Sequence, residues 1–341
     1  MNCADVFARD AYGYDLPLDL IAQYPLAQRA KARLMVISRR DGTIRHSIFN
    51  RLGQYLPPKT TCIVNNSKVI PARLWGHKAK TGGMVEVFLL KPLDDGHCFE
   101  ALINPLKRVR EGELLEFPSG ITAIVVDKEK RLVRFNKKNI LALLKDMGHI
   151  PLPPYIKRKD EPSDRVDYQT VYAKHGGSVA SPTAGLHFTK RLMASLKARG
   201  HVFKELTLHI NYGTFKPVVC ADIREHPMHS EAYSIRASAY KAVIDAKGRG
   251  IPVAAIGTTS CRVLEAVVGT GQLEGETDMF MYPGYPFRLV DILVTNFHLP
   301  YSTLLMLVCA FGGYDLVMRA YREAIKEQYR FYSYGDAMVI I

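Results

Sequence analysis

The second half of the chain alternates between short apolar runs and segments with helical composition. Residues 206–210, 251–256 and 289–294 have the length and apolar content typical of buried strands, and residues 237–247 and 261–268 are predicted helices. Residues 61–64 form a similar apolar run in the first half. Strands and helices in alternation are typical of an α/β layer, so the sequence predicts an α/β main domain with a mixed sheet.

A different pattern occupies residues 74–138. Apolar and polar positions alternate at residues 85–89, and further short strands are predicted at 99–103, 114–117, 121–126 and 132–135. Glycine-containing turns separate these strands. We therefore expect a small all-β, barrel-like domain inserted into the α/β domain. The predicted insert is residues 74–148, and the discontinuous main domain is residues 1–73 and 149–341.

Polar side chains directly follow several of the predicted strands. The clusters lie at residues 65–68, 211–215, 257–260 and 295–300. Open α/β sheets bind ligands beyond the carboxyl ends of their strands, so we expect a site where these clusters meet. The cluster at 257–260 suits an anion, although it lacks the P-loop lysine and the full set of Rossmann glycines. A turn stabilised by its own Asn, Ser or Thr side chains is the alternative at each cluster.

The stretch at residues 181–189 (SPTAGLHFT) concentrates hydroxyls, a glycine and an imidazole. Thr189 precedes an amphipathic segment, residues 190–199, so we predict a helix with Thr189 as its N-cap and Gly200 as its stop. A polar loop before a helix offers backbone N–H groups that suit a carboxylate, a phosphate or the edge of a nucleotide. A capped turn around a buried, hydrogen-bonded His187 is the alternative.

Composition and charge narrow the class of protein. The 341 residues are 48% apolar, which is typical of a globular chain with room for two domains. The 46 Lys and Arg against 33 Asp and Glu give a formal charge of +13, which favours a polyanionic partner, although a merely basic protein has the same signature. The cysteines lie singly, no signal peptide is evident, and the apolar window at 303–311 is too short to span a bilayer. We therefore expect a cytoplasmic protein without membrane contact.

Two basic loops are candidate RNA contacts. They contain Lys107, Arg108 and Arg110 in the predicted barrel, and Tyr155, Lys157 and Arg158 in a proline-rich segment. Cations meet phosphates and aromatic rings stack on bases, which suits an RNA surface. A solvated turn and an interdomain linker are the respective alternatives.

The segment at residues 225–231 (EHPMHSE) is the richest cluster of titratable side chains. Its His-x-x-His spacing suggests a metal site, but the His-Glu-x-x-His order of zinc proteases is absent. We therefore expect no metal, and we favour proton transfer or substrate hydrogen bonding for His229 and Glu231.

The order of short sequence phrases carries a resemblance that spans essentially the whole chain. The phrases are VIPARL (69–74), HIPLPPYI (149–156), YQTVYA (168–173), PTAGLHF (182–188), GTF (213–215), MHSE (228–231), GTTS (257–260), VTNFHLP (294–300) and YRFYSYGDAM (329–338). In their order and spacing the sequence resembles the S-adenosylmethionine:tRNA ribosyltransferase-isomerases of queuosine biosynthesis. Each phrase is weak alone, and together they are highly specific.

The resemblance implies an activity. Enzymes of this family transfer the ribosyl group of S-adenosylmethionine to 7-aminomethyl-7-deazaguanine (preQ1) at the wobble position of tRNA with a GUN anticodon. The group isomerises to an epoxycyclopentane, which gives epoxyqueuosine, adenine and methionine. The resemblance also implies no metal, no cofactor beyond S-adenosylmethionine as ribosyl donor, a monomer in the cytoplasm, and an α/β domain interrupted by a small β-barrel.

The implied chemistry assigns roles to particular side chains. The candidate catalytic residues are His187, His229, Glu231 and His298, one of which removes a proton next to the sulfonium. The candidate substrate-binding residues are Asn65, Arg73, Thr183, Gly185, Gly213, Thr214, Thr258, Thr259, Ser260, Arg262 and Asn296.

Within this set, we expect His187 to contact the reacting ribose and the hydroxyls at 258–260 to hold the methionine carboxylate. The two asparagine amides are expected to recognise base edges, and the two arginines to meet carboxylate or phosphate. A structural turn or cap is the alternative for each.

Two other classes of protein remain as alternatives. A non-catalytic RNA-binding protein would share the basic charge and the aromatic loops. A hydrolase would use Ser181 or Ser260 with a histidine, but the G-x-S-x-G elbow of such enzymes is absent.

Overall fold

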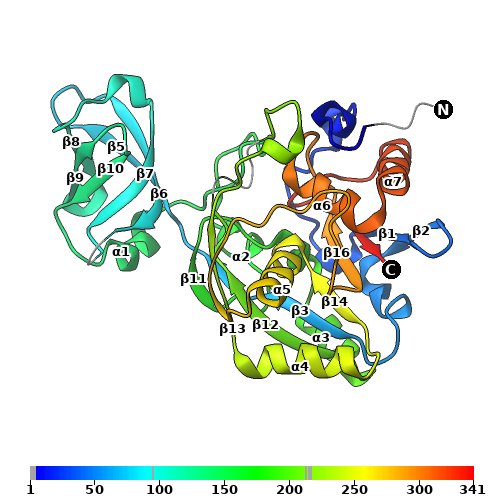
Figure 1. Ribbon diagram of the computed structural model, residues 1–341. Coiled ribbons are helices and arrows are strands. Elements are labelled where there is room, and N and C mark those ends of the chain that lie inside the picture. Colours follow the sequence, from blue (N-terminus) through cyan, green and yellow to red (C-terminus); the bar gives the residue numbers. More distant parts are fainter. Residues whose placement is uncertain (1–4, 94–95, 212, 214–216) are drawn as a thin grey trace.

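The main domain is built on one large mixed sheet. The computed structural model describes residues 5–93, 96–211, 213 and 217–341. Its largest sheet has nine strands in the order β15-β13-β12-β3-β14-β16-β17-β1-β2 (Figure 1). The bounds are β15 Glu274–Thr277, β13 Glu231–Ile235, β12 Val202–Leu208, β3 Thr61–Asn65, β14 Val253–Ile256, β16 Ile292–Asn296, β17 Ala337–Ile340, β1 Arg33–Ile37 and β2 Ile44–Ile48.

The strands β12, β3, β14 and β16 at the centre of this sheet are parallel neighbours. Every residue of β3, β14 and β16 is buried, as expected for parallel strands covered on both faces. The strand predicted at 289–294 lies later, at β16, because the backbone N–H groups of Leu289 and Val290 donate to the carboxylate of Glu265 instead of pairing with a strand.

Helices cover both faces of the sheet. On one face, the apolar core includes side chains from α4 (Ala237–Gly248), α5 (Thr258–Thr270), α6 (Thr303–Gly312) and α7 (Tyr314–Lys326). On the other face lie α3 (Lys190–Ala198) and the 3-10 segment Phe49–Gln54. The helix predicted after Thr189 is confirmed as α3, because the Thr189 hydroxyl accepts a 3.1 Å hydrogen bond from the backbone N–H of Leu192.

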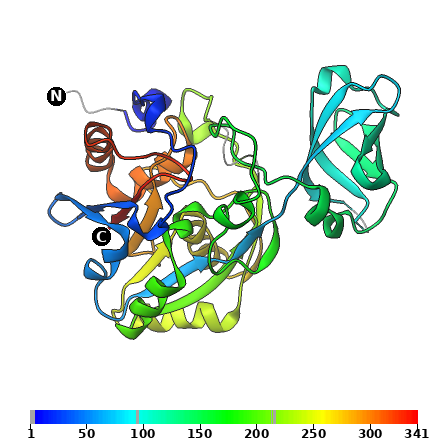
Figure 2. The same cartoon turned by 180° about the vertical axis from the view of Figure 1, so that it is seen from behind.

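A closed six-stranded barrel projects from one side of the main domain (Figure 2). Its order is β10-β7-β6-β5-β8-β9, with bounds β5 Arg73–Lys78, β6 Met84–Pro92, β7 Cys98–Asn104, β8 Leu114–Phe117, β9 Ile121–Asp127 and β10 Leu132–Phe135. Alternate side chains fill a separate apolar core, closed by α1 (Ile140–Met147). The predicted fold class is therefore confirmed: an α/β domain with a mixed sheet is interrupted by a small β-barrel.

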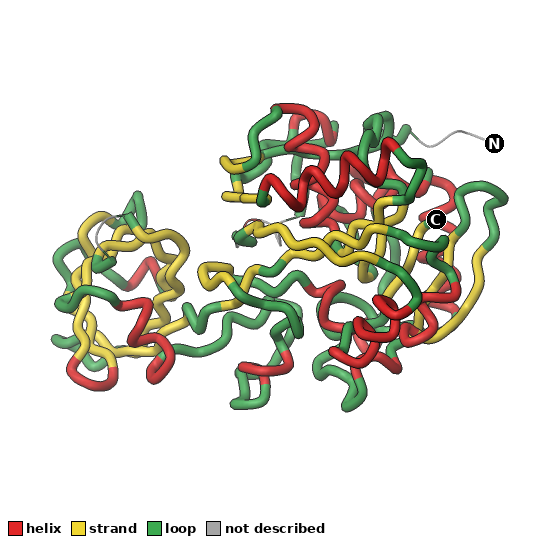
Figure 3. Tube along the Cα trace, turned by 90° about the horizontal axis from the view of Figure 1, so that it is seen from below, coloured by secondary structure: helices red, strands yellow, loops and turns green. Residues whose placement is uncertain are grey.

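The chain enters and leaves the barrel at one place. Arg73 and His149 exchange backbone hydrogen bonds of 3.2 Å and 2.8 Å, so the two crossing segments lie side by side (Figure 3). Gly148 is required at this crossing, because a Cβ there would lie 2.0 Å from the carbonyl oxygen of Pro71.

The remaining described elements are short. They are α2 Asp164–Asp167, the parallel pair β4 Ser67–Val69 and β11 His175–Ser178, and the 3-10 segments Arg9–Tyr12, Leu18–Leu20, Arg29–Lys31, Leu106–Arg108, Pro118–Gly120, Thr183–His187 and Ile223–Glu225. Among the described residues, no single helix is long and apolar enough to cross a membrane; α6 and α7, bent by 117°, meet the length and composition criteria only as a pair.

Candidate functional site

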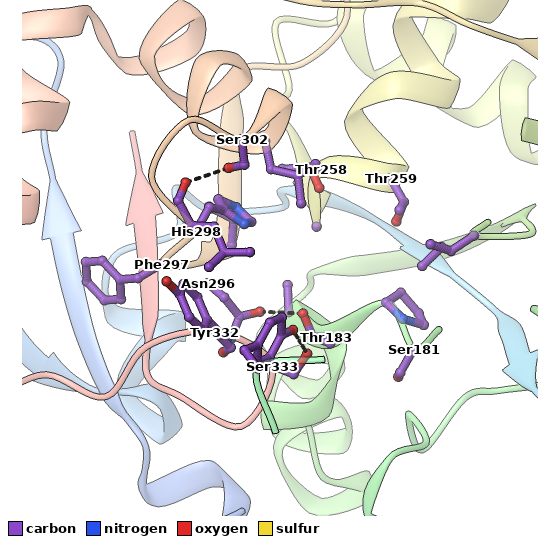
Figure 4. Close-up of a pocket in the computed structure, with 18 residues that line it drawn as sticks. Ser181, Thr183, Thr258, Thr259, Asn296, Phe297, His298, Ser302, Tyr332 and Ser333 are labelled. Carbon is purple, nitrogen blue, oxygen red and sulfur yellow. Dashed lines mark hydrogen bonds between the residues drawn. The ribbon is translucent and has the colours of Figure 1, made fainter. Parts of the chain in front are cut away.

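A pocket lies at the edge where the central strands end. β3, β14 and β16 stop there, and β17, antiparallel to β16, begins at the same edge. The walls come from the start of α5, the stretch before α3, and the segments after β16 and before β17 (Figure 4). Of the residues named from the sequence, the lining includes Tyr155, Ser181, Thr183, Thr258, Thr259, Asn296 and His298.

Helix α5 presents its N-terminus to this pocket. Gly257 has a φ of 93°, a conformation that glycine adopts without strain, and it turns β14 directly into the helix. Among the described residues, no side chain caps α5, and Thr258 and Thr259 begin the helix in the pocket wall. An uncapped start of a 13-residue helix attracts negative charge.

Ser260 does not share this position. Its Oγ donates a 2.9 Å hydrogen bond to the carbonyl oxygen of Ile256, and the side chain is fully buried. The third helical residue thus turns its hydroxyl back onto the strand, and the expectation that Ser260 holds a carboxylate remains a prediction.

The stretch before α3 forms the facing wall (Figure 4). Ser181 is buried in the lining, and its Oγ has no hydrogen-bond partner among the described residues. Gly185 packs against Tyr172, since an added Cβ would lie 2.0 Å from the Tyr172 hydroxyl oxygen. Gly185 therefore serves close packing, and it is absent from the pocket lining.

Asn296 joins the two walls. Its Oδ1 accepts a 3.0 Å hydrogen bond from the Thr183 hydroxyl, and its Nδ2 donates to Nε2 of His187 at 3.1 Å and to the carbonyl oxygen of Tyr332 at 3.2 Å. Most of the hydrogen-bonding capacity predicted for a base edge is thus used within the protein. Asn296 fixes the shape of the pocket.

His187 lies behind Asn296 and outside the pocket lining. Burial, with a smaller effect from the charges of Arg29 and Arg330, lowers the pKa of His187 to about 3. The neutral ring accepts the amide hydrogen of Asn296. His187 thus reaches the pocket wall through Asn296, and its predicted contact with a ribose remains a prediction.

His298 is the buried imidazole that lines the pocket. Its Nε2 lies 2.8 Å from the hydroxyl of Thr295, and its backbone N–H donates to the Tyr321 hydroxyl at 2.9 Å. Burial lowers the pKa of His298 to about 3, so the ring is neutral near pH 7. In this neutral ring, the nitrogen that carries no hydrogen is a hydrogen-bond acceptor.

An aromatic wall completes the pocket. The rings of Tyr155 and Tyr332 have centroids 4.7 Å apart, and the Tyr155 hydroxyl lies 2.6 Å from Oγ of Ser333. Sequence reasoning placed Tyr155 on an RNA surface and did not select Tyr332 or Ser333. The phrase YRFYSYGDAM contained both, but only the antiparallel return of β17 brings them to this edge.

Comparison with known proteins identifies the family. A family model described as "Queuosine biosynthesis protein" matches residues 9–340. The chain belongs to this family. It is 48% identical over 332 residues to the S-adenosylmethionine:tRNA ribosyltransferase-isomerase of Sulfurihydrogenibium sp. strain YO3AOP1, with 97% of this chain and 98% of the relative covered. It is 47% identical to the enzyme of the same name from Natranaerobius thermophilus, with the same shares covered.

A solved structure agrees in fold. The S-adenosylmethionine tRNA ribosyltransferase of Thermotoga maritima is 35% identical, with a TM-score of 0.57, and the match covers 97% of this chain and 100% of that chain. The fold and the sequence comparison therefore point to the same queuosine biosynthesis family.

Within this family member, Glu231 and Arg262 form a buried ion pair, with 2% and 4% of their side chains exposed. Arg262 also donates to the carbonyl oxygens of Met279 and Thr277 at 3.1 Å and 3.3 Å, and Glu231 accepts from the backbone N–H of Asn211 at 2.9 Å. Neither residue lines the pocket. The pair holds β13 against α5, and the roles in proton transfer and ligand binding that the sequence suggested remain predictions.

Asn65 and Arg73 are also engaged within the protein. The amide of Asn65 exchanges hydrogen bonds with the backbone of Leu208 at 3.0 Å and 3.1 Å, accepts from Ser67 N at 3.0 Å, and donates to Thr259 Oγ1 at 3.3 Å. All four of its hydrogen-bonding positions are thus used, so it supports the start of α5 instead of binding a base. Arg73 pairs with Glu86 at 2.8 Å at the barrel crossing, away from the pocket lining.

Of the loop with Gly213 and His229, the described residues contribute nothing to the pocket lining. His229 is exposed, and a Cβ at Gly213 would lie 2.3 Å from Cδ2 of the His229 ring. Thr214 lies outside the described residues. The substrate roles of Gly213, Thr214 and His229 remain predictions.

The candidate tRNA contacts separate into two groups. Lys107, Arg108, Arg110 and Lys157 are exposed and available to a partner. Arg158 instead makes a bidentate pair with Asp164 at 2.7 Å and 2.8 Å, with its guanidinium 4.2 Å from the centre of the Tyr24 ring. The hydrogen bonds to Asp164 raise the pKa of Arg158. This arginine therefore stabilises the proline-rich segment, and its assignment as a tRNA contact remains a prediction.

Metal ligands do not gather in the described part of the chain. No group of three or more His, Cys, Asp or Glu side chains there could hold a metal ion. The pocket's polar groups are hydroxyls, amides and one imidazole, which suit an organic substrate with its own charges.

Proposed function

We propose that this chain is an S-adenosylmethionine:tRNA ribosyltransferase-isomerase of queuosine biosynthesis. Relatives of that name match over 97% of the chain. The observation that carries the proposal is the pocket, which brings together an uncapped helix start, an unpartnered buried hydroxyl, an aromatic wall and a neutral imidazole. Each of these groups suits one part of the donor substrate.

The methionine end of the donor belongs at the start of α5. The carboxylate is anionic, and the free N–H groups and the dipole at the start of α5 favour negative charge there. The hydroxyl of Thr258 lies in the same pocket wall and can donate a further hydrogen bond. The unpartnered Ser181 hydroxyl on the opposite wall supplies a further donor. This assignment keeps the predicted role of Thr258 and Thr259 and exchanges Ser260 for Ser181.

The sulfonium of the donor belongs against the aromatic wall. A sulfonium is a cation, and the faces of Tyr155 and Tyr332 attract cations through their π electrons. The neighbouring pocket residues Ile210, Leu299 and Leu304 suit apolar parts of the same molecule. The donor would thus lie along the sheet edge, with its carboxylate at the start of α5 and its sulfonium at the aromatic wall.

His298 is the proposed general base. With Nε2–H donating to Thr295, Nδ1 keeps a lone pair that can accept a proton from the ribose carbon next to the sulfonium. Adenine then leaves, the amine of the acceptor base attacks the ribosyl group, and methionine departs as the epoxide closes. In this proposal His187 does not touch the donor and instead holds the amide of Asn296 in place.

The acceptor is proposed to be preQ1 in tRNA with a GUN anticodon. The net charge of +13 and the exposed cations of the barrel support a polyanionic acceptor. We propose, as the family resemblance implies, that the enzyme acts as a monomer. Its substrates place it in the cytoplasm.

The rival hydrolase finds little support at this site. Ser260 Oγ is bonded to a backbone carbonyl, and Ser181 Oγ has no histidine within hydrogen-bond distance in the described part of the chain. A serine nucleophile needs such a base. A non-catalytic RNA-binding protein would not need a pocket with these groups.

The test combines the chain with S-adenosylmethionine and tRNA carrying preQ1, and it measures free adenine. The wild-type chain should release adenine only when that tRNA is present. His298→Ala should abolish release while equilibrium dialysis still detects S-adenosylmethionine binding, and His201→Ala, which removes a buried histidine outside the pocket, should keep activity. Release by His298→Ala at the wild-type rate would remove His298 from the mechanism, and no release by the wild type would contradict the function.

A further inference from the structure

A second cavity runs along β12, from Phe203 to His209. Ile210 lines the pocket, and the preceding residue, His209, lines this other cavity. We call it the histidine groove and define it by His175 of β11, Lys204 and His209 of the β12 segment, and Arg236 before α4. These elements lie on the side of the main domain toward the barrel (Figure 1).

The carboxylate of Glu205 in the groove is already paired within the protein. Glu205 accepts hydrogen bonds from Nζ of Lys174 at 2.7 Å to both carboxylate oxygens, and Nδ2 of Asn66 donates to it at 3.1 Å. The hydroxyl of Thr207 donates to Oδ1 of Asn66 at 2.7 Å. The one carboxylate of the groove lining therefore has its partners within the protein.

The cationic side chains of the groove outnumber its carboxylates. Lys204 and Arg236 form no close ion pair among the described residues, and Arg236 is exposed. The charge of Arg236 acts on Glu205 alongside that of Lys174. Nδ1 of His209 is buried and has no hydrogen-bond partner in the described part of the chain. Burial and the neighbouring His175 lower the pKa of His209. An anion in the groove would supply the missing acceptor for His209 and balance the two cations.

We propose that the histidine groove binds a backbone phosphate of the tRNA while the target nucleotide occupies the pocket. The proposal rests on the proposed function, and it adds a phosphate contact that lies outside the barrel. Arginine, lysine and histidine donors around an open groove suit a phosphodiester, which carries one negative charge and accepts several hydrogen bonds. Because His209 and Ile210 are consecutive, the groove lining begins one residue from the pocket lining.

The test compares Arg236→Ala and His175→Ala with Arg249→Ala in the full chain. Arg236 and Arg249 flank opposite ends of α4, and all three side chains are exposed, so each variant should fold. Fluorescence anisotropy of labelled tRNA is measured over a range of salt concentrations, together with KM and kcat for adenine release.

Arg236→Ala should weaken tRNA binding roughly tenfold and reduce the slope of log affinity against log salt by about 1. KM for S-adenosylmethionine and kcat at saturating tRNA should stay at wild-type values, and Arg249→Ala should leave the salt slope unchanged. His175→Ala should act like Arg236→Ala with a smaller effect. If Arg236→Ala and Arg249→Ala bind tRNA alike, the groove is not a phosphate site.

Failure of the proposed function would look different from failure of the groove. A wild-type chain that binds tRNA but releases no adenine would contradict the activity, whereas the anisotropy comparison would still decide whether the groove holds a phosphate. A wild-type chain that shows no salt-dependent tRNA binding would overturn both.

Discussion

His187 and His298 show how two side chains of one type take different places around a site. Both are buried, with a pKa that burial lowers to about 3. His187 reaches the pocket only through the amide of Asn296, whereas His298 lies in its wall. The distinction between an imidazole behind the pocket wall and one in it depends on the tertiary structure and could not be drawn from the sequence.

These two histidines predict acid sensitivity. An unfolded histidine has a pKa near ~6.5, so below that pH the unfolded chain binds protons that the folded chain excludes. Their contribution to stability is full above pH ~6.5 and falls as the pH drops, by up to about 1.4 kcal/mol per pH unit for each histidine. Urea unfolding between about pH 7.5 and 5 should show this loss.

The matched variants for this measurement are His298→Gln and His77→Gln. His298→Gln should reduce the dependence of unfolding free energy on pH, and His77→Gln, at an exposed barrel position, should retain it. A wild-type unfolding free energy that stays flat over this pH range would contradict the buried neutral assignment.

Ser181 is the second residue with a specific expectation. Ser181→Ala should raise KM for S-adenosylmethionine roughly fivefold, which corresponds to the loss of about 1 kcal/mol from one hydrogen bond. The control is Ser67→Ala, because the Ser67 hydroxyl is also buried without a described partner but lies outside the pocket lining. Steady-state kinetics in which both variants match the wild type would remove Ser181 from the binding site.

The sequence predicted residue types better than their partners. Thr258, Thr259 and His298 were selected correctly as groups of the strand-end cluster, since spacing places them at a sheet edge. Glu231 was selected from the titratable segment at 225–231 and Arg262 from beside the cluster at 257–260, yet their charges neutralise each other across a distance of 31 positions in the chain. Such pairings depend on tertiary contacts that no local pattern encodes.

At the scale of elements, the start of α5 organises the pocket. Gly257 and Gly271 have positive φ values of 93° and 74° at opposite ends of this helix. Alanine at either position should destabilise the fold by about 1–2 kcal/mol, because a Cβ is disfavoured in this conformation. Only Gly257→Ala should also weaken S-adenosylmethionine binding, since only this end lies in the pocket.

Thermal unfolding and calorimetric titration of both variants test this expectation. The affinity of Gly271→Ala should stay near that of the wild type, while Gly257→Ala should lose roughly tenfold, or about 1.4 kcal/mol. Equal affinities in the two variants would show that the position of the α5 start does not govern binding.

The secondary structure was more predictable than the sheet order. Parallel strands such as β3 and β14 are continuous apolar runs, and the barrel strands alternate, so local pattern identified both kinds. Strand order was not accessible, because β17 from the chain end inserts between β16 and β1. That insertion brings Tyr332 and Ser333 into the pocket, which explains why the sequence did not single them out.

At the scale of the whole molecule, the pocket and the barrel are separable. All residues of the pocket lining come from outside residues 74–148, and the chain crosses between the parts where Arg73 and His149 pair. We therefore expect residues 74–148 to form a domain that can be replaced by a short Gly-Ser linker. The barrel carries Lys107, Arg108 and Arg110, so its removal should weaken tRNA binding.

Two measurements on this shortened chain test whether the main domain folds and binds S-adenosylmethionine without residues 74–148. Circular dichroism should show a cooperative unfolding transition, and calorimetry should show S-adenosylmethionine binding close to that of the full chain. A shortened chain that unfolds cooperatively but no longer binds S-adenosylmethionine would contradict a pocket confined to the main domain.

The most direct test of the account follows the ribosyl group itself. The full chain is incubated with S-adenosylmethionine labelled with carbon-13 throughout its ribose, and with tRNA carrying preQ1. The account predicts a labelled, heavier nucleoside in the tRNA by mass spectrometry, together with unlabelled adenine and unlabelled methionine in equal amounts. Label that remains in small molecules while the tRNA nucleoside keeps its mass would contradict ribosyl transfer.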